Sequence, residues 1–160
     1  MSLACTGTYV CVPPSRHSAL AAGNTLTFVS ECSLFQAHEG PVAALTTDAS
    51  GGLLATGSAD RGLRVWDVAV GRATHNFRGH QGIVSPLLFH PDHRRLQLFS
   101  GGAEGVVYLW DLVRGTLLAR FSAHFSAITD LALSPDGNTL LSASRDKVRR
   151  HGRTASAAQH

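Results

Sequence analysis

Residues 79–111 read GHQGIVSPLLFHPDHRRLQLFSGGAEGVVYLWD, a stretch that begins with Gly-His and ends with Trp-Asp. Between these two pairs lie short apolar runs, separated by the turn-forming segments His-Pro-Asp-His and Gly-Gly-Ala-Glu-Gly. Short apolar runs with separators of this composition are typical of β-strands joined by hairpins. The stretch therefore predicts an antiparallel β-meander and decides the fold class, which is all-β.

The same order of residues recurs along the chain. His38, His80 and His124 each open a unit, and they stand 42 and 44 residues apart. The apolar runs of the first unit predict strands near residues 42–47, 53–58, 62–67 and 73–77. Because a four-stranded meander cannot bury both of its faces alone, such units are expected to stack on one another.

A period of about 40–45 residues with Gly-His near its start and Trp-Asp at its end resembles the WD-repeat family. The resemblance covers residues 38–148 and includes Gly79-His80, Trp66-Asp67 and Trp110-Asp111. It implies β-propeller blades, each a four-stranded antiparallel meander. Propellers use four to eight blades, and the matching residues supply about two and a half, so we expect an incomplete, open array. Such a chain is interpreted as a fragment or a truncated isoform.

The pattern divides the chain into three parts. We expect a divergent, poorly ordered leader over residues 1–32, a WD-repeat region over 33–148, and a basic, Ser/Ala-rich disordered tail over 149–160. The third unit lacks its Trp-Asp, which predicts that its last two strands are missing and that Leu140–Ser144 ends the meander as an unpaired edge. Unpaired edges recruit other strands, so we expect a marginally stable chain that self-associates.

The resemblance also implies a structural role for the polar residues, because WD repeats bury a hydrogen-bonded chain of His, Ser or Thr, Asp and Trp in each blade. In the second unit Gly102 stands where serine is expected, so its network is predicted to be incomplete. The implied members are His38, Ser58, Asp60 and Trp66 in the first unit, His80, Glu104 and Trp110 in the second, and His124, Ser144 and Asp146 in the third.

Catalytic and metal sites find little support in the sequence. The spacing of Cys5, Cys11 and His17 matches no zinc pattern, and His90 with His93 lacks further ligands at suitable spacing. No phosphate-binding loop or nucleophile elbow occurs. We therefore expect no enzyme activity, no metal and no cofactor.

Charge and composition narrow the choice of partners. The net charge is +3, but the basic excess lies in residues 145–160, and the rest of the chain is nearly neutral. A nucleic-acid binder would show a positive footprint on its folded body. In the tail, Arg149, Arg150 and Arg153 could act as a nuclear signal or a phosphate-contacting arm. The three cysteines fit a reducing compartment, and the absence of a long apolar run excludes a spanning helix.

Within the WD-repeat family, the particular residues of these repeats resemble WD-repeat subunits of the small-subunit processome, a nucleolar assembly. The similar segments are 74–79, 89–92, 96–100, 123–129 and 144–147. This implies a protein-interaction scaffold in pre-rRNA processing and small ribosomal subunit biogenesis. Its partners would be protein subunits of a large ribonucleoprotein assembly, with indirect or weak RNA contact and no membrane or small-molecule substrate. Two alternatives stay open: a cytoplasmic WD-repeat adaptor for ubiquitin ligation or signalling, and a direct RNA-binding module.

Overall fold

The computed structural model describes residues 4–6, 9–12, 33–122, 124–146 and 149–153. In this part of the chain every regular element is a β-strand, and neighbouring strands pair antiparallel. None of the described residues belongs to a helix long and apolar enough to cross a membrane. The predicted all-β class is confirmed.

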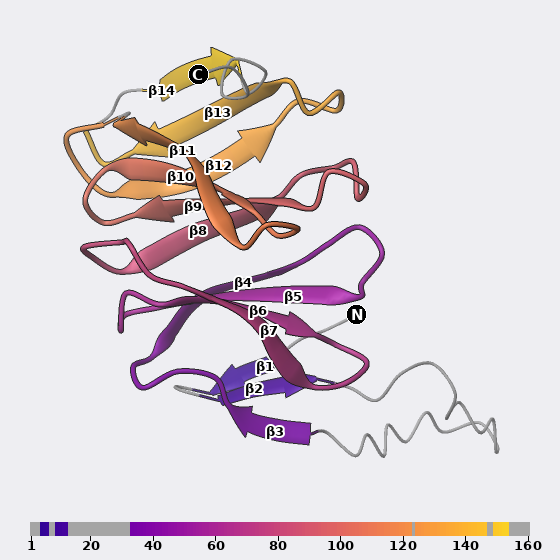
Figure 1. The fold of residues 1–160 in the computed structure, drawn as a ribbon. Coiled ribbons are helices and arrows are strands. Elements are labelled where there is room, and N and C mark those ends of the chain that lie inside the picture. Colours follow the sequence, from indigo (N-terminus) through magenta and orange to yellow (C-terminus); the bar gives the residue numbers. More distant parts are fainter. Residues whose placement is uncertain (1–3, 7–8, 13–32, 123, 147–148, 154–160) are drawn as a thin grey trace, which may run out of the picture.

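Two complete four-stranded blades form the centre of the structure, and both are simple meanders (Figure 1). The first blade contains β4 (Val42–Thr47), β5 (Leu53–Ser58), β6 (Leu63–Asp67) and β7 (Arg72–Phe77). The second contains β8 (Val84–Phe89), β9 (Gln97–Gly102), β10 (Val106–Asp111) and β11 (Thr116–Ser122). The predicted blade architecture is therefore confirmed.

Local hydrogen bonds explain where the strands of the first blade turn. The Asp48 carboxylate accepts backbone N–H bonds from Ser50 at 3.2 Å and Leu53 at 2.8 Å, which closes the turn between β4 and β5. Gly51 supplies the left-handed conformation in this turn, with φ of 73°. Asp67 acts similarly after β6, where its carboxylate accepts the N–H of Ala69 at 2.9 Å. Aspartate and glycine residues thus determine where the hairpin turns of this blade form.

A three-stranded sheet lies at each end of the array, and both sheets correct the expectations from sequence. One contains β1 (Ala4–Thr6), β2 (Tyr9–Val12) and β3 (Ser33–Gln36), so the expected leader contributes two strands. The other contains β12 (Ile128–Leu133), β13 (Thr139–Ser144) and β14 (Arg149–Arg153).

The third strand of the last sheet overturns the prediction that Leu140–Ser144 is an unpaired edge. β14 pairs antiparallel with β13, from Ala143 opposite Arg149 to Thr139 opposite Arg153. The first five residues of the expected disordered tail are therefore a strand. Ladder hydrogen bonds use backbone groups, so a basic segment without apolar alternation can still pair. Self-association remains a prediction, and it now concerns the outer edge of β14.

The blades stack through their sheet faces, and β4, β8 and β12 are the strands by which successive blades meet. Close approach is possible because β5 and β9 carry glycine at the contact: a Cβ on Gly57 would meet the Val84 side chain, and one on Gly101 would meet Ile128. The main apolar core, which includes Val65, Phe77 and Trp110, lies between the two four-stranded blades. Among the described residues the sheets form an open array, as expected (Figure 1).

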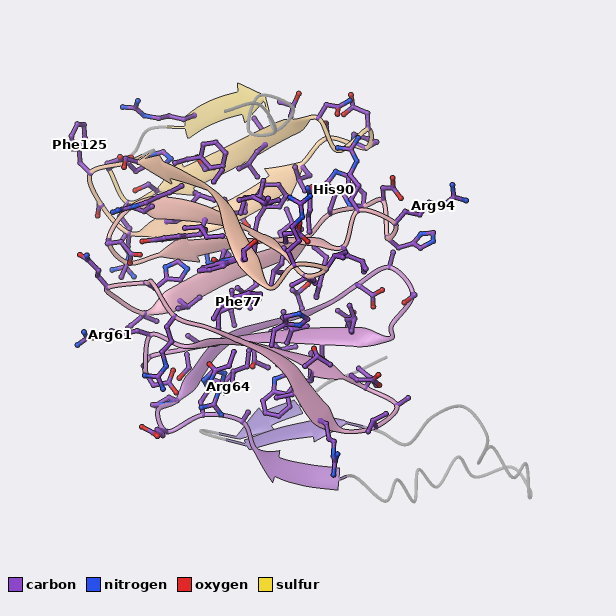
Figure 2. The ribbon with its side chains drawn as sticks, in the orientation of Figure 1. Arg61, Arg64, Phe77, His90, Arg94 and Phe125 are labelled. Carbon is purple, nitrogen blue, oxygen red and sulfur yellow. The ribbon has the colours of Figure 1, made fainter. Side chains whose placement is uncertain are left out.

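The antiparallel topology gives the array two edges of different composition. The loops before β4, β8 and β12, which carry the repeat histidines, emerge at the same edge as the β5–β6, β9–β10 and β13–β14 turns. We call this edge the histidine face, and the edge with the remaining turns the opposite face. Figure 2 shows Arg61 and Phe125 at the histidine face, and His90 and Arg94 at the opposite face.

Candidate functional site

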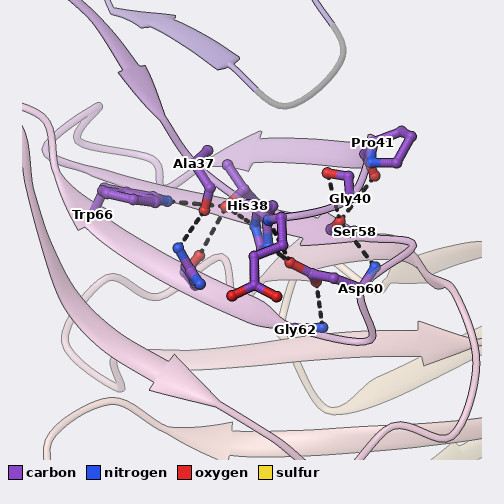
Figure 3. Close-up of polar contacts among 11 residues, drawn as sticks. Ala37, His38, Gly40, Pro41, Ser58, Asp60, Gly62 and Trp66 are labelled. Atoms are coloured by element: carbon purple, nitrogen blue, oxygen red, sulfur yellow. Dashed lines mark hydrogen bonds and ion pairs between the residues drawn. The ribbon is translucent and has the colours of Figure 1, made fainter.

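A chain of side-chain hydrogen bonds crosses the first blade from its core to the histidine face (Figure 3). The Trp66 indole donates to Thr56 Oγ1 at 2.9 Å, and Thr56 Oγ1 lies 2.8 Å from His38 Nε2. His38 Nδ1 lies 3.0 Å from Asp60 Oδ2. Because an ionised carboxylate can only accept, the His38 Nδ1–H donates to Asp60, and Nε2 of the neutral ring accepts from the Thr56 hydroxyl.

The hydroxyl in this network belongs to Thr56, and the prediction of Ser58 was wrong. Ser58 lies two residues further along β5, where its Oγ contacts the carbonyl oxygens of Gly40 at 3.1 Å and Pro41 at 2.9 Å. Ser58 Oγ also accepts the backbone N–H of Asp60 at 3.1 Å. It therefore ties the β5–β6 turn to the loop before β4 and takes no part in the indole–imidazole link.

The second blade contains the same network in full, contrary to the prediction that it is incomplete. Ser100 Oγ lies 2.7 Å from His80 Nε2 and accepts the Trp110 indole N–H at 2.8 Å. His80 Nδ1 lies 2.8 Å from Glu104 Oε1. Ser100 occupies the position of Thr56, so the glycine at position 102 removes nothing from the network.

In the third unit Ser142, and not Ser144, contacts the loop histidine. His124 Nε2 lies 2.8 Å from Ser142 Oγ, and His124 Nδ1 lies 3.0 Å from Asp146 Oδ2. Ser144 Oγ donates to the Ser126 carbonyl at 2.9 Å. A signal for the correct assignment was present in the sequence: Thr56, Ser100 and Ser142 put a hydroxyl at the same place in all three repeats, whereas the position predicted does not.

The acid of the second blade is longer than its counterparts, and a neighbouring glycine accommodates it. A Cβ on Gly102 would overlap the Glu104 carboxylate, so only glycine leaves this space free. Within the described part of the chain Glu104 Oε2 is buried and has no hydrogen-bond partner. Gly102 and Glu104 together thus replace the Ser58 and Asp60 pair of the first blade.

Burial keeps His38 and His80 neutral, and hydrogen bonding keeps Asp60 charged. Burial lowers the pKa of His38 below its ordinary value, although Asp60 opposes this effect, and burial likewise lowers the pKa of His80. Burial alone would raise the pKa of Asp60, but hydrogen bonds from Gly62, His38 and Glu39 outweigh it and lower the pKa. The imidazoles of His38 and His80 therefore serve as neutral links between a hydroxyl and a carboxylate.

The other histidines considered from sequence do not form a metal site in the described residues. His90 is buried and its Nδ1 accepts the Asp92 N–H at 3.0 Å, while His93 is exposed. No cluster of three or more His, Cys, Asp or Glu with metal-binding geometry occurs in the described ranges. The side chains of Cys5, Cys11 and His17 lie outside what the structure describes.

Comparisons with known proteins agree with this blade geometry. The family described as "WD domain, G-beta repeat" matches residues 29–67, 71–111 and 115–148. Transducin beta-like protein 3 from Rattus norvegicus is 46% identical over 111 residues, which are 69% of this chain and 14% of that protein. The protein of the same name from Bos taurus is 47% identical over the same shares.

A shorter match is found with cell division control protein 4 of Saccharomyces cerevisiae, which is 50% identical over 50 residues, or 31% of this chain and 6% of that protein. The chain spans about 14% of the length of the transducin beta-like relatives. The family match covers most of the chain, and both complete blades carry the indole–hydroxyl–imidazole–carboxylate network. The chain therefore belongs to the WD-repeat family.

Proposed function

We propose that the chain is a non-enzymatic scaffold for protein–protein interaction that acts in the small-subunit processome. In this role it contributes to pre-rRNA processing and small ribosomal subunit biogenesis in the nucleolus. Its partners are other protein subunits of this ribonucleoprotein assembly, and its contact with RNA is indirect or weak. Support comes from the WD-repeat family, whose members are typically non-catalytic scaffolds, and from the similarity to transducin beta-like protein 3.

The observation that supports the scaffold role most strongly is that both ring nitrogens of every repeat histidine are hydrogen-bonded within its own blade. Each repeat histidine forms a hydrogen bond to a hydroxyl through one ring nitrogen and to a carboxylate through the other; the three are His38, His80 and His124. The side chains of the three histidines are buried. An imidazole with both nitrogens occupied in a buried network is suited to hold a fold and poorly suited to exchange protons with a substrate.

The histidine face offers an aromatic side chain to a protein partner. Phe125 follows His124 directly, and it is 94% exposed. Its backbone N–H donates to Asp146 Oδ2 at 3.2 Å, so the loop that carries the ring is tied to the blade. Aromatic side chains held on a rigid support are frequent anchors of protein interfaces. This placement supports docking at the histidine face (Figure 2).

A second candidate is a WD-repeat adaptor of another pathway, such as ubiquitin ligation or signalling. The similarity to cell division control protein 4 favours keeping it. A direct RNA-binding module is the third candidate, and the nearly neutral body of the chain counts against it. The experiment below separates the three because each predicts a different class of co-purified molecule.

We expect the affinity-tagged chain, expressed in cells, to co-purify with processome proteins when the eluate is quantified by mass spectrometry. Phe125→Ser should reduce their recovery roughly tenfold, because an exposed aromatic anchor is lost without any change to the blade. Val113→Ser is the matched control, since Val113 is 71% exposed in the turn between β10 and β11 on the opposite face. The recovery of processome proteins with this variant should equal their recovery with the unmodified chain.

Three results would contradict the proposal. Enrichment of ubiquitin-ligase or signalling proteins in place of processome proteins would favour the adaptor. Cross-linking of RNA directly to the chain, without protein subunits, would favour the RNA-binding module. Equal loss of partners in Phe125→Ser and Val113→Ser would show that docking does not depend on the histidine face.

A further inference from the structure

A cavity of about 530 Å³ opens at the histidine face beside the first blade. Three arginines line it: Arg61 from the β5–β6 turn, Arg64 from β6, and Arg78 from the loop after β7. The acids in its wall are Glu39 and Asp60. Figure 2 shows Arg61 and Arg64 on the same side of this blade. The cavity touches the blade networks at Asp60 and His80, whereas the Thr56 and Ser100 hydroxyls are not among its lining residues.

Arg64 is held in place, but its guanidinium is only partly compensated. Its Nη1 donates to the Ala37 carbonyl oxygen at 2.6 Å, which fixes the direction of the side chain. Its Nε is buried and has no hydrogen-bond partner among the described residues. A cation that has lost water without gaining full hydrogen bonding attracts an anion more strongly than a solvated one. Arg64 therefore forms a fixed positive floor.

Arg61 and Arg78 are exposed side chains beside this floor. Arg61 adopts the left-handed backbone conformation with φ of 66°, which the tight β5–β6 turn requires. Among the described residues none of the three arginines forms an ion pair with an acid. Three arginines without acidic partners among the described residues thus line one cavity.

The two acids in the wall do not have equal freedom to neutralise these cations. The Asp60 carboxylate already accepts from His38 Nδ1, the Gly62 N–H at 2.8 Å and the Glu39 N–H at 3.1 Å. These three donors therefore already compensate the charge of the Asp60 carboxylate. Glu39 is exposed at the cavity. The cavity combines a fixed cationic floor with a single free carboxylate.

We propose that this cavity binds an acidic side chain of a protein partner, whose carboxylate pairs with the Arg64, Arg61 and Arg78 cluster. Glu39 then accepts a hydrogen bond from a basic or amide donor next to that acid. The proposal rests on the scaffold function and gives the chemistry of one partner segment. A protein segment fits better than RNA, because Glu39 and Asp60 would repel the continuous row of phosphates that RNA presents.

The test measures fluorescence anisotropy of a labelled short oligoglutamate peptide with the purified 160-residue chain. Oligoglutamine of the same length and a short oligouridylate serve as the neutral and RNA probes. We expect saturable binding of oligoglutamate and no saturable binding of oligoglutamine or oligouridylate. The double variant Arg61→Glu/Arg78→Glu should bind it roughly tenfold more weakly or worse, because two of three guanidinium partners become repulsive. Thermal melting should remain unchanged, since both side chains are exposed.

The matched control is Arg72→Glu/Arg94→Glu, which makes the same change in charge with two exposed arginines at the opposite face. Its affinity for oligoglutamate should stay within about twofold of the unmodified chain. Equal losses in both double variants would overturn the proposal, because the attraction would then be a property of net charge. Tighter binding of oligouridylate than of oligoglutamate, lost in Arg61→Glu/Arg78→Glu, would assign the cavity to RNA.

A further arm separates this proposal from the scaffold function itself. Binding of oligoglutamate is measured without any cellular partner, so it can fail while co-purification with processome proteins succeeds. That combination would refute the cavity alone. Arg64→Lys, which keeps the charge but not the fork geometry, should weaken oligoglutamate binding, and unchanged affinity in this variant would contradict the role of Arg64.

Discussion

Asp60→Ala is expected to lower the free energy of unfolding by about 3–5 kcal/mol, the usual cost of removing one partner from a buried charged network. The substitution removes the acceptor for the His38 Nδ1–H, the Gly62 N–H and the Glu39 N–H together. These donors lie at the junction of the β5–β6 turn with the loop before β4. Because the His38 side chain is buried, its Nδ1–H loses the carboxylate that holds it in the blade network.

Urea denaturation followed by tryptophan fluorescence measures this loss. Asp130→Ala is the matched control, because Asp130 is an exposed aspartate on β12 whose carboxylate, among the described residues, accepts the neighbouring Leu131 N–H at 2.9 Å. Its effect should stay within about 0.5 kcal/mol. If Asp60→Ala cost no more than Asp130→Ala, the carboxylate–imidazole contact would not stabilise the blade.

Gly102→Ser is expected to destabilise the chain by about 2–3 kcal/mol on its own, and Glu104→Asp should largely reverse that loss. A side chain at position 102 overlaps the Glu104 carboxylate, which must then leave His80 Nδ1. Shortening the acid to aspartate removes the overlap. The double variant recreates the serine and aspartate arrangement that Ser58 and Asp60 adopt in the first blade.

A double-mutant cycle, measured by chemical denaturation, tests this coupling. We expect the double variant to be more stable than Gly102→Ser by roughly 2 kcal/mol, whereas Glu104→Asp alone should not stabilise the chain, so that the cycle gives a favourable coupling energy between the two positions. Additive losses would show that Gly102 and Glu104 are independent. The first blade provides the reference geometry, so Asp60→Glu in that blade should be poorly tolerated because Ser58 occupies the space that glycine leaves free in the second.

The repeat pattern predicted the two central blades closely. The strands predicted near 42–47 and 53–58 coincide with β4 and β5, and those near 62–67 and 73–77 differ from β6 and β7 by one residue. The reason is local: aspartate and glycine turns end each apolar run, and the Asp48 and Asp67 carboxylates cap them. Local chemistry of this kind can be recognised in a single sequence.

The three-stranded sheets were not predicted because their pairing is independent of the usual apolar pattern. Arg149–Arg153 carries no alternation of apolar residues, yet its backbone continues the ladder from β13. β1 and β2 similarly lie far from β3 in the sequence. A strand of this type is defined by the neighbour that it meets, and the sequence alone does not reveal that neighbour.

Prediction of the polar residues from sequence was limited for a different reason. The histidines and acids were predicted from their recurrence, whereas Ser58 was chosen over Thr56 because both hydroxyls lie on the same strand. The strand register, which places Trp66 opposite Leu54, shows which hydroxyl reaches the indole, in agreement with the hydroxyl that recurs at Thr56, Ser100 and Ser142. The arginine cavity was equally hidden, because Arg61, Arg64 and Arg78 come together only after β5, β6 and β7 have folded.

Each complete blade is held by a buried series of hydrogen bonds that runs from indole to carboxylate. The chain contains two tryptophans, Trp66 and Trp110, and both indoles donate to buried hydroxyls. Hydrogen exchange of the two indole N–H protons, followed by NMR, therefore measures whether these bonds persist in the folded blades. We expect both protons to exchange slowly, and Thr56→Val to accelerate the Trp66 proton alone. Exchange of either indole proton at the rate of an unfolded peptide, while the amides of β5 and β9 stay protected, would show that the indole–hydroxyl bond does not hold the blade.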